Sequence, residues 1–162
     1  MKQIVLSLLV DNNPGVLARV SSLFSRRNYN IESIAAGVTN DTRYTRISVA
    51  VSGDDQILEQ IRAQINKLEE VRKIIELDRD QSVCREMVLV KVMADKKEKR
   101  DLISIADVFR AKVVDVSTDS VIIELTGTQN KLDAFLNLLS DFDVLEMVRT
   151  GITGLERGIS TL

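Results

Sequence analysis

The sequence contains no histidine and no tryptophan, and its 162 residues include a single cysteine and a single proline. Without histidine, the chain lacks the commonest general base, the commonest metal ligand and the usual charge switch near neutral pH. Cys84 has no second thiol or histidine with which to form a disulfide or a metal site, so we interpret it as a bystander thiol. The composition therefore argues against a metal site and against histidine-based catalysis, and we nominate no catalytic residue.

Excess positive charge is absent as well. The 22 Lys and Arg residues are outnumbered by 24 Asp and Glu residues, so the formal net charge is −2 and no overall positive field attracts phosphate backbones. The one basic cluster, KKEKR at 96–100, contains Glu98 and precedes an apolar helical pattern, which indicates a solvated helix start. We therefore expect no nucleic-acid partner.

Long apolar runs are missing too. No run approaches the roughly 20 residues needed to span a bilayer. The run at residues 4–10 is followed by polar residues instead of a small-residue cleavage site, so it predicts a strand and not a signal peptide. With 44% apolar and 28% charged residues, the chain has the composition of a compact globular protein. We expect a soluble, cytoplasmic protein with no membrane partner.

The two halves of the chain carry the same order of patterns. Alternating apolar residues predict strands, and apolar residues spaced by three or four predict helices. The first half reads strand 4–10, helix 14–27, strands 30–39 and 43–52, helix 55–68 and strand 71–77. The second half reads strand 88–92, helix 102–109, strands 111–117 and 120–127, helix 132–139 and strand 143–151. Each half is βαββαβ, so we predict an α+β fold of two tandem ferredoxin-like domains, each an antiparallel sheet with helices on one face.

The predicted domains are 1–78 and 87–162, joined by a polar linker at 79–86. The first strand carries apolar residues on both faces, which indicates that another subunit or the other half of the chain covers its second face. The glycines of TGITGLERG have the wrong spacing for a nucleotide-binding loop, and we interpret this segment as a tail turn.

The stretch DNNPGVLARV, residues 11–20, has two interpretations. Asn13 before Pro14 predicts a helix N-cap followed by proline at the first helical position, which explains the stretch without a ligand. The same helix start offers unpaired N–H groups, and Gly15 leaves room for a small anion such as a carboxylate. Asn28 and Asn30 in RNYNIES either end the helix or add to a polar site. The residues alone leave both interpretations open.

The segment DNNPGVLARVSSLFSRRNYNIESIAAG, with LEQIRAQINKLEEV after it, resembles the N-terminal ACT domain of the small regulatory subunits of acetolactate synthase, or acetohydroxyacid synthase. The segments MVLVKV, VFRAKVVDV, LTGTQNKLDAFLNLL and RTGITGLERG resemble the C-terminal domain of that family, so the resemblance covers essentially the whole chain. It implies a non-catalytic regulatory subunit of branched-chain amino-acid (valine, leucine and isoleucine) biosynthesis. Such a subunit activates the catalytic large subunit and confers feedback inhibition by valine. Thiamine diphosphate, magnesium and FAD are implied on the large subunit, with no cofactor in this chain.

The resemblance also implies a valine effector site between the ACT domains of a homodimer. The expected effector residues are Asn12, Asn13, Pro14, Gly15, Val16, Leu17, Asn30 and Ile31, of which Asn13 and Pro14 lie in a variable part of the family motif. Helix N–H groups near Gly15 are expected to take the valine carboxylate, and the side-chain oxygens of Asn12 and Asn30 to accept from its ammonium. Ile31 is expected to line the pocket for the valine side chain.

We consider two alternative functions. A free-standing amino-acid-binding ACT-type regulator would share the first domain, but it would need an output module, and the sequence has no helix-turn-helix pattern. A tandem of RNA-binding ferredoxin-like domains would need aromatic residues on its sheets and a basic face, whereas only 4% of the residues are aromatic.

Overall fold

The computed structural model describes residues 2–27 and 29–162, so the expectation for Asn28 lies outside the described residues. Contacts divide the chain into two compact units, one made of Met1–Cys84 together with Gly151–Leu162 and the other of Arg85–Thr150. None of the helices in the described ranges is long and apolar enough to cross a membrane.

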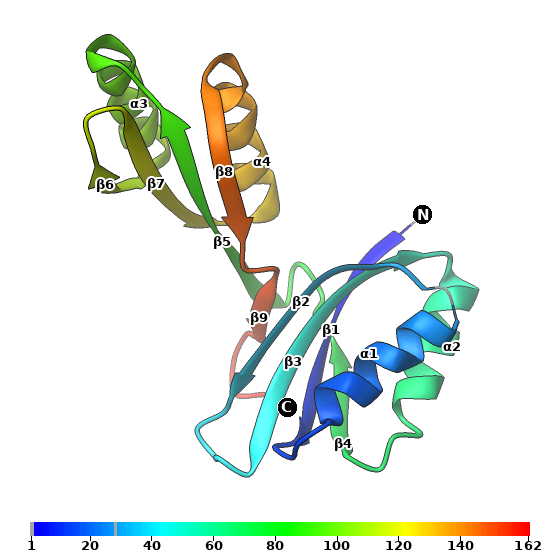
Figure 1. Cartoon of the computed structure of the whole chain (residues 1–162). Helices are drawn as coiled ribbons and strands as arrows, with labels where there is room; N and C mark the ends of the chain where they lie inside the picture. Colours follow the sequence, from blue (N-terminus) through cyan, green and yellow to red (C-terminus); the bar gives the residue numbers. More distant parts are fainter. Residues whose placement is uncertain (1, 28) are drawn as a thin grey trace. The chain divides into compact units, whose positions relative to one another are not determined.

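The first unit is a βαββαβ fold with an antiparallel sheet (Figure 1). Its elements are β1 (Lys2–Asp11), α1 (Val16–Arg26), β2 (Ile31–Val38), β3 (Tyr44–Gly53), α2 (Asp55–Ile65) and β4 (Val71–Glu76). The strand order is β2-β3-β1-β4, so β2 and β4 are the edges. Alternate residues of β1 and β3 bury one face of the sheet against the two helices. That core includes Leu6, Leu8, Val49, Val20, Phe24, Ile61 and Ile65.

The second unit repeats this plan. Its elements are β5 (Ser82–Met93), α3 (Lys96–Phe109), β6 (Lys112–Val116), β7 (Ser120–Gly127), α4 (Gln129–Leu138), a short 3-10 helix (Leu139–Asp141) and β8 (Asp143–Arg149). The strand order is β6-β7-β5-β8. Phe109 and Phe135 meet edge to face, with ring centroids 5.4 Å apart, where α3 and α4 pack together. The prediction of two tandem ferredoxin-like domains is confirmed.

The basic cluster at 96–100 forms the first turns of α3, as predicted. Asp95 caps the helix by accepting from the N–H groups of Lys97 and Glu98, and the Glu98 side chain accepts in return from the Asp95 N–H at 2.9 Å. Lys99 donates to the Ser117 carbonyl at 2.7 Å. Asp95 and Glu98 therefore stabilise the helix start, and Lys99 connects it to a neighbouring turn.

The structure corrects the predicted C-terminal domain, 87–162. Residues 151–162 belong to the first unit, where a further strand, β9 (Thr153–Glu156), pairs with β5. Next to this strand, the Arg157 N–H donates to the Gln81 carbonyl at 2.7 Å. The tail turn predicted for this segment is wrong, because β9 is a four-residue strand, too short for its alternation to appear in the sequence.

The predicted linker at 79–86 is shorter than expected. Strand β5 begins at Ser82, and both Ser82 and Glu86 are buried. Cys84 is thus half-buried in a strand and not in a polar linker, and a Cβ atom added to Gly154 would lie 2.8 Å from its Sγ. Cys84 therefore packs tightly against β9.

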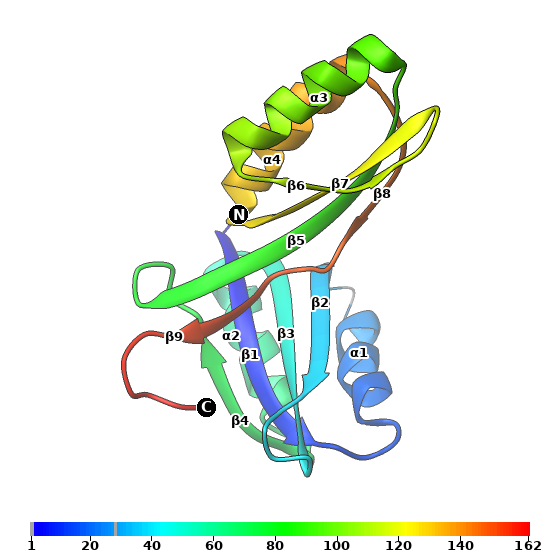
Figure 2. The same cartoon turned by 90° about the vertical axis from the view of Figure 1, so that its left-hand side faces the viewer.

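The second face of the first sheet is partly covered by the C-terminal segment of the chain. Figure 2 shows α1 and α2 on one face of this sheet and β9 on the other. Ser7, Ser48 and Ala50, whose side chains point away from the helices, are fully buried. Arg46 reaches from this face to the Gly154 carbonyl of β9 at 3.4 Å. Residues 151–162 thus supply part of the covering that the sequence predicts for the second face of this sheet.

The turn between β2 and β3 contains an ion pair that leads to a prediction about pH dependence. Asp41 accepts from the Arg43 guanidinium at 2.6 Å and from the Arg43 backbone N–H at 3.1 Å, and these bonds lower the pKa of Asp41 from 3.8 to about 2. Because the folded-state pKa is the lower one, the stabilisation is present above pH 3.8 and is lost as the pH falls through about 2. Arg43→Leu should raise the pKa of Asp41 toward 3.8, as followed by carboxyl ¹³C NMR. A parent chain whose Asp41 already titrates near 3.8 would contradict this.

Candidate ligand-binding site

A type II turn precedes α1. The Val16 N–H donates to the Asn13 carbonyl at 3.4 Å, Pro14 holds the second position of the turn, and Gly15 the third, with φ 83° and ψ −7°. Asn13 is therefore not the N-cap, and Pro14 is not the first helical residue, which corrects that expectation. The Pro-Gly pair favours this turn because glycine alone accepts a positive φ without strain, and the helix consequently starts at Val16.

The start of α1 is open to an anion. Gly15 occupies the N-cap position, and no side chain caps the helix in the described part of the chain. The Arg19 N–H already donates to the Gly15 carbonyl at 3.0 Å, so the preceding N–H groups of Leu17 and Ala18 are those at the positive end of the helix. Leu17 is 47% exposed, whereas the Val16 side chain is buried in the core. Of the expected residues here, Val16 therefore offers a ligand no side chain, and its N–H already donates to the Asn13 carbonyl.

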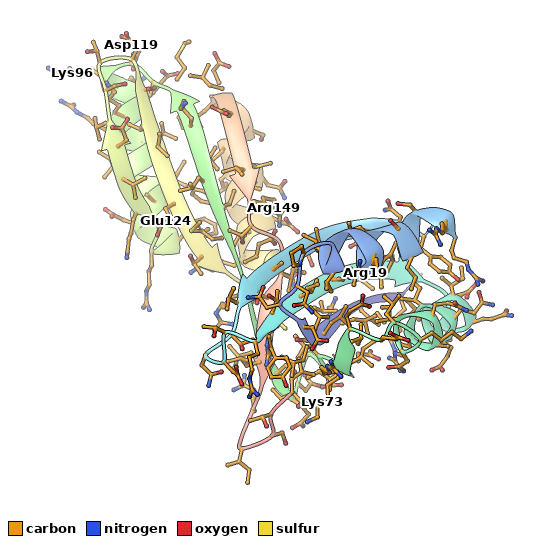
Figure 3. The ribbon with its side chains drawn as sticks, turned by 60° about the horizontal axis from the view of Figure 1, so that its bottom comes forward. Arg19, Lys73, Lys96, Asp119, Glu124 and Arg149 are labelled. Carbon is orange, nitrogen blue, oxygen red and sulfur yellow. The ribbon has the colours of Figure 1, made fainter. Side chains whose placement is uncertain are left out.

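Arg19 adds a positive charge that we did not predict from the sequence. A Cβ atom placed on Gly15 would lie 3.1 Å from its Nη1 atom. Figure 3 labels Arg19 on α1, and its Nε atom is 2.6 Å from Oε1 of Glu70. The spacing of four residues between Gly15 and Arg19 is the signal that could have revealed this neighbour, because such residues share one face of a helix.

Asn12 ties the loop before α1 to the sheet. Its Nδ2 atom donates to the Thr42 carbonyl at 2.9 Å, and its Oδ1 atom accepts from Thr45 Oγ1 at 3.1 Å. Because an amide oxygen has two lone pairs, Oδ1 retains one acceptor site. The neighbouring Asp11 accepts from Arg72 at 2.7 Å, and this bond lowers the pKa of the Asp11 carboxyl. The side chain of Asn12 is therefore held in place beside the start of α1.

Asn30 and Ile31 lie at the other end of α1. Asn30 is exposed just before β2, and Ile31 is the half-buried first residue of that strand. An 11-residue helix is about 16 Å long at about 1.5 Å per residue, so one chain does not bring these residues to Gly15. The last residue of β2, Val38, lies at the end of the sheet where α1 begins, because it pairs with Thr45, whose hydroxyl donates to Asn12.

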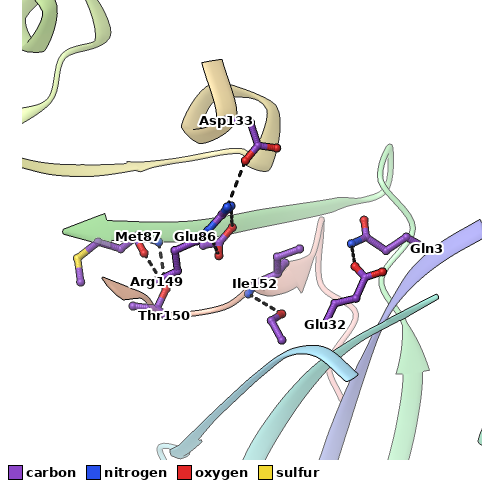
Figure 4. Close-up of polar contacts among 9 residues, drawn as sticks. Gln3, Glu32, Glu86, Met87, Asp133, Arg149, Thr150 and Ile152 are labelled. Carbon is purple, nitrogen blue, oxygen red and sulfur yellow. Dashed lines mark hydrogen bonds and ion pairs between the residues drawn. The ribbon is translucent and has the colours of Figure 1, made fainter. Parts of the chain in front are cut away.

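The second unit contains a buried ion pair. Arg149 donates through Nε and Nη2 to the two carboxylate oxygens of Glu86 at 2.9 and 2.8 Å, and its Nη1 atom is 3.2 Å from Asp133 Oδ1 (Figure 4). Glu86 is only 5% exposed. The hydrogen bonds that Arg149 donates to Glu86 raise the pKa of Arg149, so this cation stays charged, and we interpret the cluster as structural. No group of three metal-ligating side chains occurs in residues 2–27 and 29–162.

Two ferredoxin-like units in tandem define the fold class of this chain, and a family match identifies the first unit as an ACT domain. Residues 6–73 match the family described as "AHAS small subunit-like ACT domain", and residues 85–158 match "Small subunit of acetolactate synthase". The chain therefore belongs to the family of acetolactate synthase small subunits, and the resemblance found in the sequence is confirmed.

Individual relatives are similar to this chain over nearly their whole length. The acetolactate synthase small subunit of Mycolicibacterium smegmatis is 50% identical over 153 residues, which cover 94% of this chain and 90% of the relative. The probable small subunit of Archaeoglobus fulgidus is 42% identical over 153 residues, which cover 94% and 96% of the two chains. The crystal structure of the small subunit from Thermotoga maritima is 40% identical with a TM-score of 0.90, covering 99% of this chain and 100% of that one.

Proposed function

We propose that this chain is the regulatory subunit of an acetolactate synthase, that it binds and activates the catalytic large subunit, and that valine inhibits the complex through it. Membership of the small-subunit family supports the partner. The observation that carries the effector assignment is the start of α1 behind a left-handed Gly15, where Leu17 and Ala18 are exposed and no described side chain caps the helix. This arrangement suits a small carboxylate.

A homodimer through the ACT domains would complete the site. Edge strands can pair with a second copy, and β2 is an open edge of the first sheet among the described residues. In a two-fold, antiparallel pairing centred on β2, Ile31 of a second copy lies opposite Val38. Since Val38 lies at the Gly15 end of the sheet, each copy would add its Asn30 and Ile31 to the other copy's helix start.

In that arrangement, both ends of valine meet suitable groups. Its carboxylate binds the N–H groups of Leu17 and Ala18, with the Arg19 guanidinium nearby. Its ammonium donates to the remaining acceptor site of Asn12 and to Asn30 of the second copy. The isopropyl group lies against Ile31 and the exposed Leu17. Neutral dipoles suffice for much of this binding because the ligand carries no net charge.

The proposal gives no catalytic role to the chain itself. Thiamine diphosphate, magnesium and FAD belong to the large subunit, because the relatives are named small subunits of the enzyme. The Cys84 thiol is packed against β9, and the carboxylate of Glu86 is held by Arg149. We place the complex in the cytoplasm, where a reducing environment suits a single thiol.

Titration of a purified large subunit with this chain tests the assembly. The two chains should elute together in gel filtration, and the rate of acetolactate formation should rise to a plateau as this chain is added. The chain alone, supplied with thiamine diphosphate, magnesium and FAD, should form no product. Separate elution and an unchanged rate would instead support the second candidate, a free-standing amino-acid-binding regulator.

A further inference from the structure

A second pocket lies within the first unit, on the face of the sheet opposite α1 and α2. Its volume is about 750 Å³, and strands β2 and β3 line one side while residues 153–162 contribute to the other. Ala35, Ser48 and Gly37 leave room on this face because their side chains are small or absent. Arg46, which pairs with Gly37, is the large side chain beside them. The pocket is therefore separate from the helix start, which lies on the other side of the sheet.

Arg46 is the one cation among the described residues that line this pocket. Its Nη1 atom is 3.4 Å from Ser7 Oγ and 3.4 Å from the Gly154 carbonyl, and both of these acceptors are neutral. In the described ranges, no carboxylate oxygen lies within 4 Å of this guanidinium. The acidic residue of the lining, Asp41, is already engaged by Arg43. Among the described residues, the pocket thus presents a half-buried positive charge with no carboxylate at ion-pair distance.

We propose that this pocket binds a small organic carboxylate with an apolar body, distinct from the effector at the start of α1. The planar guanidinium of Arg46 matches a carboxylate, and charge-assisted bonds of this kind are about twice as strong as neutral ones. Leu9, from the sheet, and Leu155, from β9, offer apolar surface for the rest of the molecule. One cation beside apolar side chains favours a monocarboxylate over a phosphate, which carries more charge.

Binding at this pocket is coupled to docking of the C-terminal segment. Because Thr153 and Leu155 of β9 line the pocket, a bound carboxylate contacts the sheet and this strand together. A ligand that binds only the docked state stabilises that state by mass action. The carboxylate should therefore slow amide hydrogen exchange in β9. A ligand bound at the start of α1 makes no contact with β9 and should leave that exchange unchanged.

NMR titration of the full chain with hexanoate, and with hexanamide as its neutral isostere, tests the proposal. Hexanoate should shift the amide resonances of Ala35, Gly37 and Ser48 saturably and slow hydrogen exchange in β9. Hexanamide should bind at least about tenfold more weakly, since it lacks the charge. Arg46→Gln should weaken hexanoate by a similar factor. Arg26→Gln removes an exposed charge from α1 and should leave the affinity unchanged.

Several results would overturn the proposal. Equal binding of hexanoate and hexanamide, or equal affinity in the parent chain and Arg46→Gln, would remove the role of the guanidinium. If Arg46→Gln does not fold, Arg46→Lys replaces it, since lysine keeps the charge but loses the planar fork, and its affinity for hexanoate should fall in between. Shifts confined to Leu17 and Ala18 would place the probe at the start of α1 and reject the second pocket.

Discussion

Gly15→Asp is expected to abolish valine inhibition while leaving activation of the large subunit intact. A side chain at this position points toward the Arg19 guanidinium, 3.1 Å from the added Cβ atom. The aspartate carboxylate would then occupy the position that the valine carboxylate needs at the start of α1. Two like charges about 4 Å apart repel by about 4 kcal/mol at an effective dielectric constant of about 20. Half of that repulsion weakens valine binding by about 30-fold.

Gly15→Asn is the matched control for this experiment. The positive φ of Gly15 strains any added side chain, so Gly15→Ala would confuse backbone strain with loss of the carboxylate site. Asparagine has the shape of aspartate without its charge, and both residues tolerate the left-handed conformation better than alanine does. Calorimetry should find much weaker valine binding in Gly15→Asp than in Gly15→Asn. Equal losses in the two variants would point to backbone geometry, and unchanged binding in Gly15→Asp would exclude this site.

Arg149→Met is expected to destabilise the second unit strongly. The substitution leaves the Glu86 carboxylate, 5% exposed, without the two bonds that Arg149 donates to it. Breaking a buried pair by removing one partner typically costs about 3–5 kcal/mol. Since Arg149 is 29% exposed, we expect about 3 kcal/mol, near the lower end of this range. Urea unfolding monitored by circular dichroism would measure the shift in midpoint.

Two further variants separate the buried charge from general effects of substitution. Lys91→Met removes a cation from β5. The Nζ atom of Lys91 is 3.1 Å from Glu146 in an exposed pair, so this substitution should lower the free energy of unfolding by less than about 1 kcal/mol. Combining Glu86→Gln with Arg149→Met removes both charges and should recover part of the loss. If Arg149→Met is no more costly than Lys91→Met, the buried pair does not stabilise the unit.

The regular parts of the fold were predictable because burial imposes a period on the sequence. In β3, Ile47, Val49 and Val51 alternate with less apolar residues because only one face of this strand meets α1 and α2. Strand β9 escaped prediction because its four residues include Gly154, which has no side chain to show a period. Its pairing with β5 also depends on residues about 70 positions away, which local patterns do not reveal.

The helix start at the candidate site was predictable in position but not in geometry, and its use by a ligand stays a prediction. The sequence pointed to the stretch around Gly15, and the structure shows a helix start there without a side-chain cap. Asn13 looked like the cap because asparagine is a favoured N-cap residue, but the Pro-Gly pair imposes a turn that moves the start to Val16. The role of Arg19 depends on its rotamer and on Glu70, a residue far along the chain.

The central claim is that valine acts through this chain. It is tested most directly by the rate of acetolactate formation by a large subunit, measured against valine concentration with and without saturating amounts of the chain. We predict that valine lowers the rate of the complex in a saturable way and does not affect the large subunit alone, and that the complex made with Gly15→Asp keeps its full rate. Equal inhibition of the large subunit with and without this chain, or a complex insensitive to valine, would contradict the account.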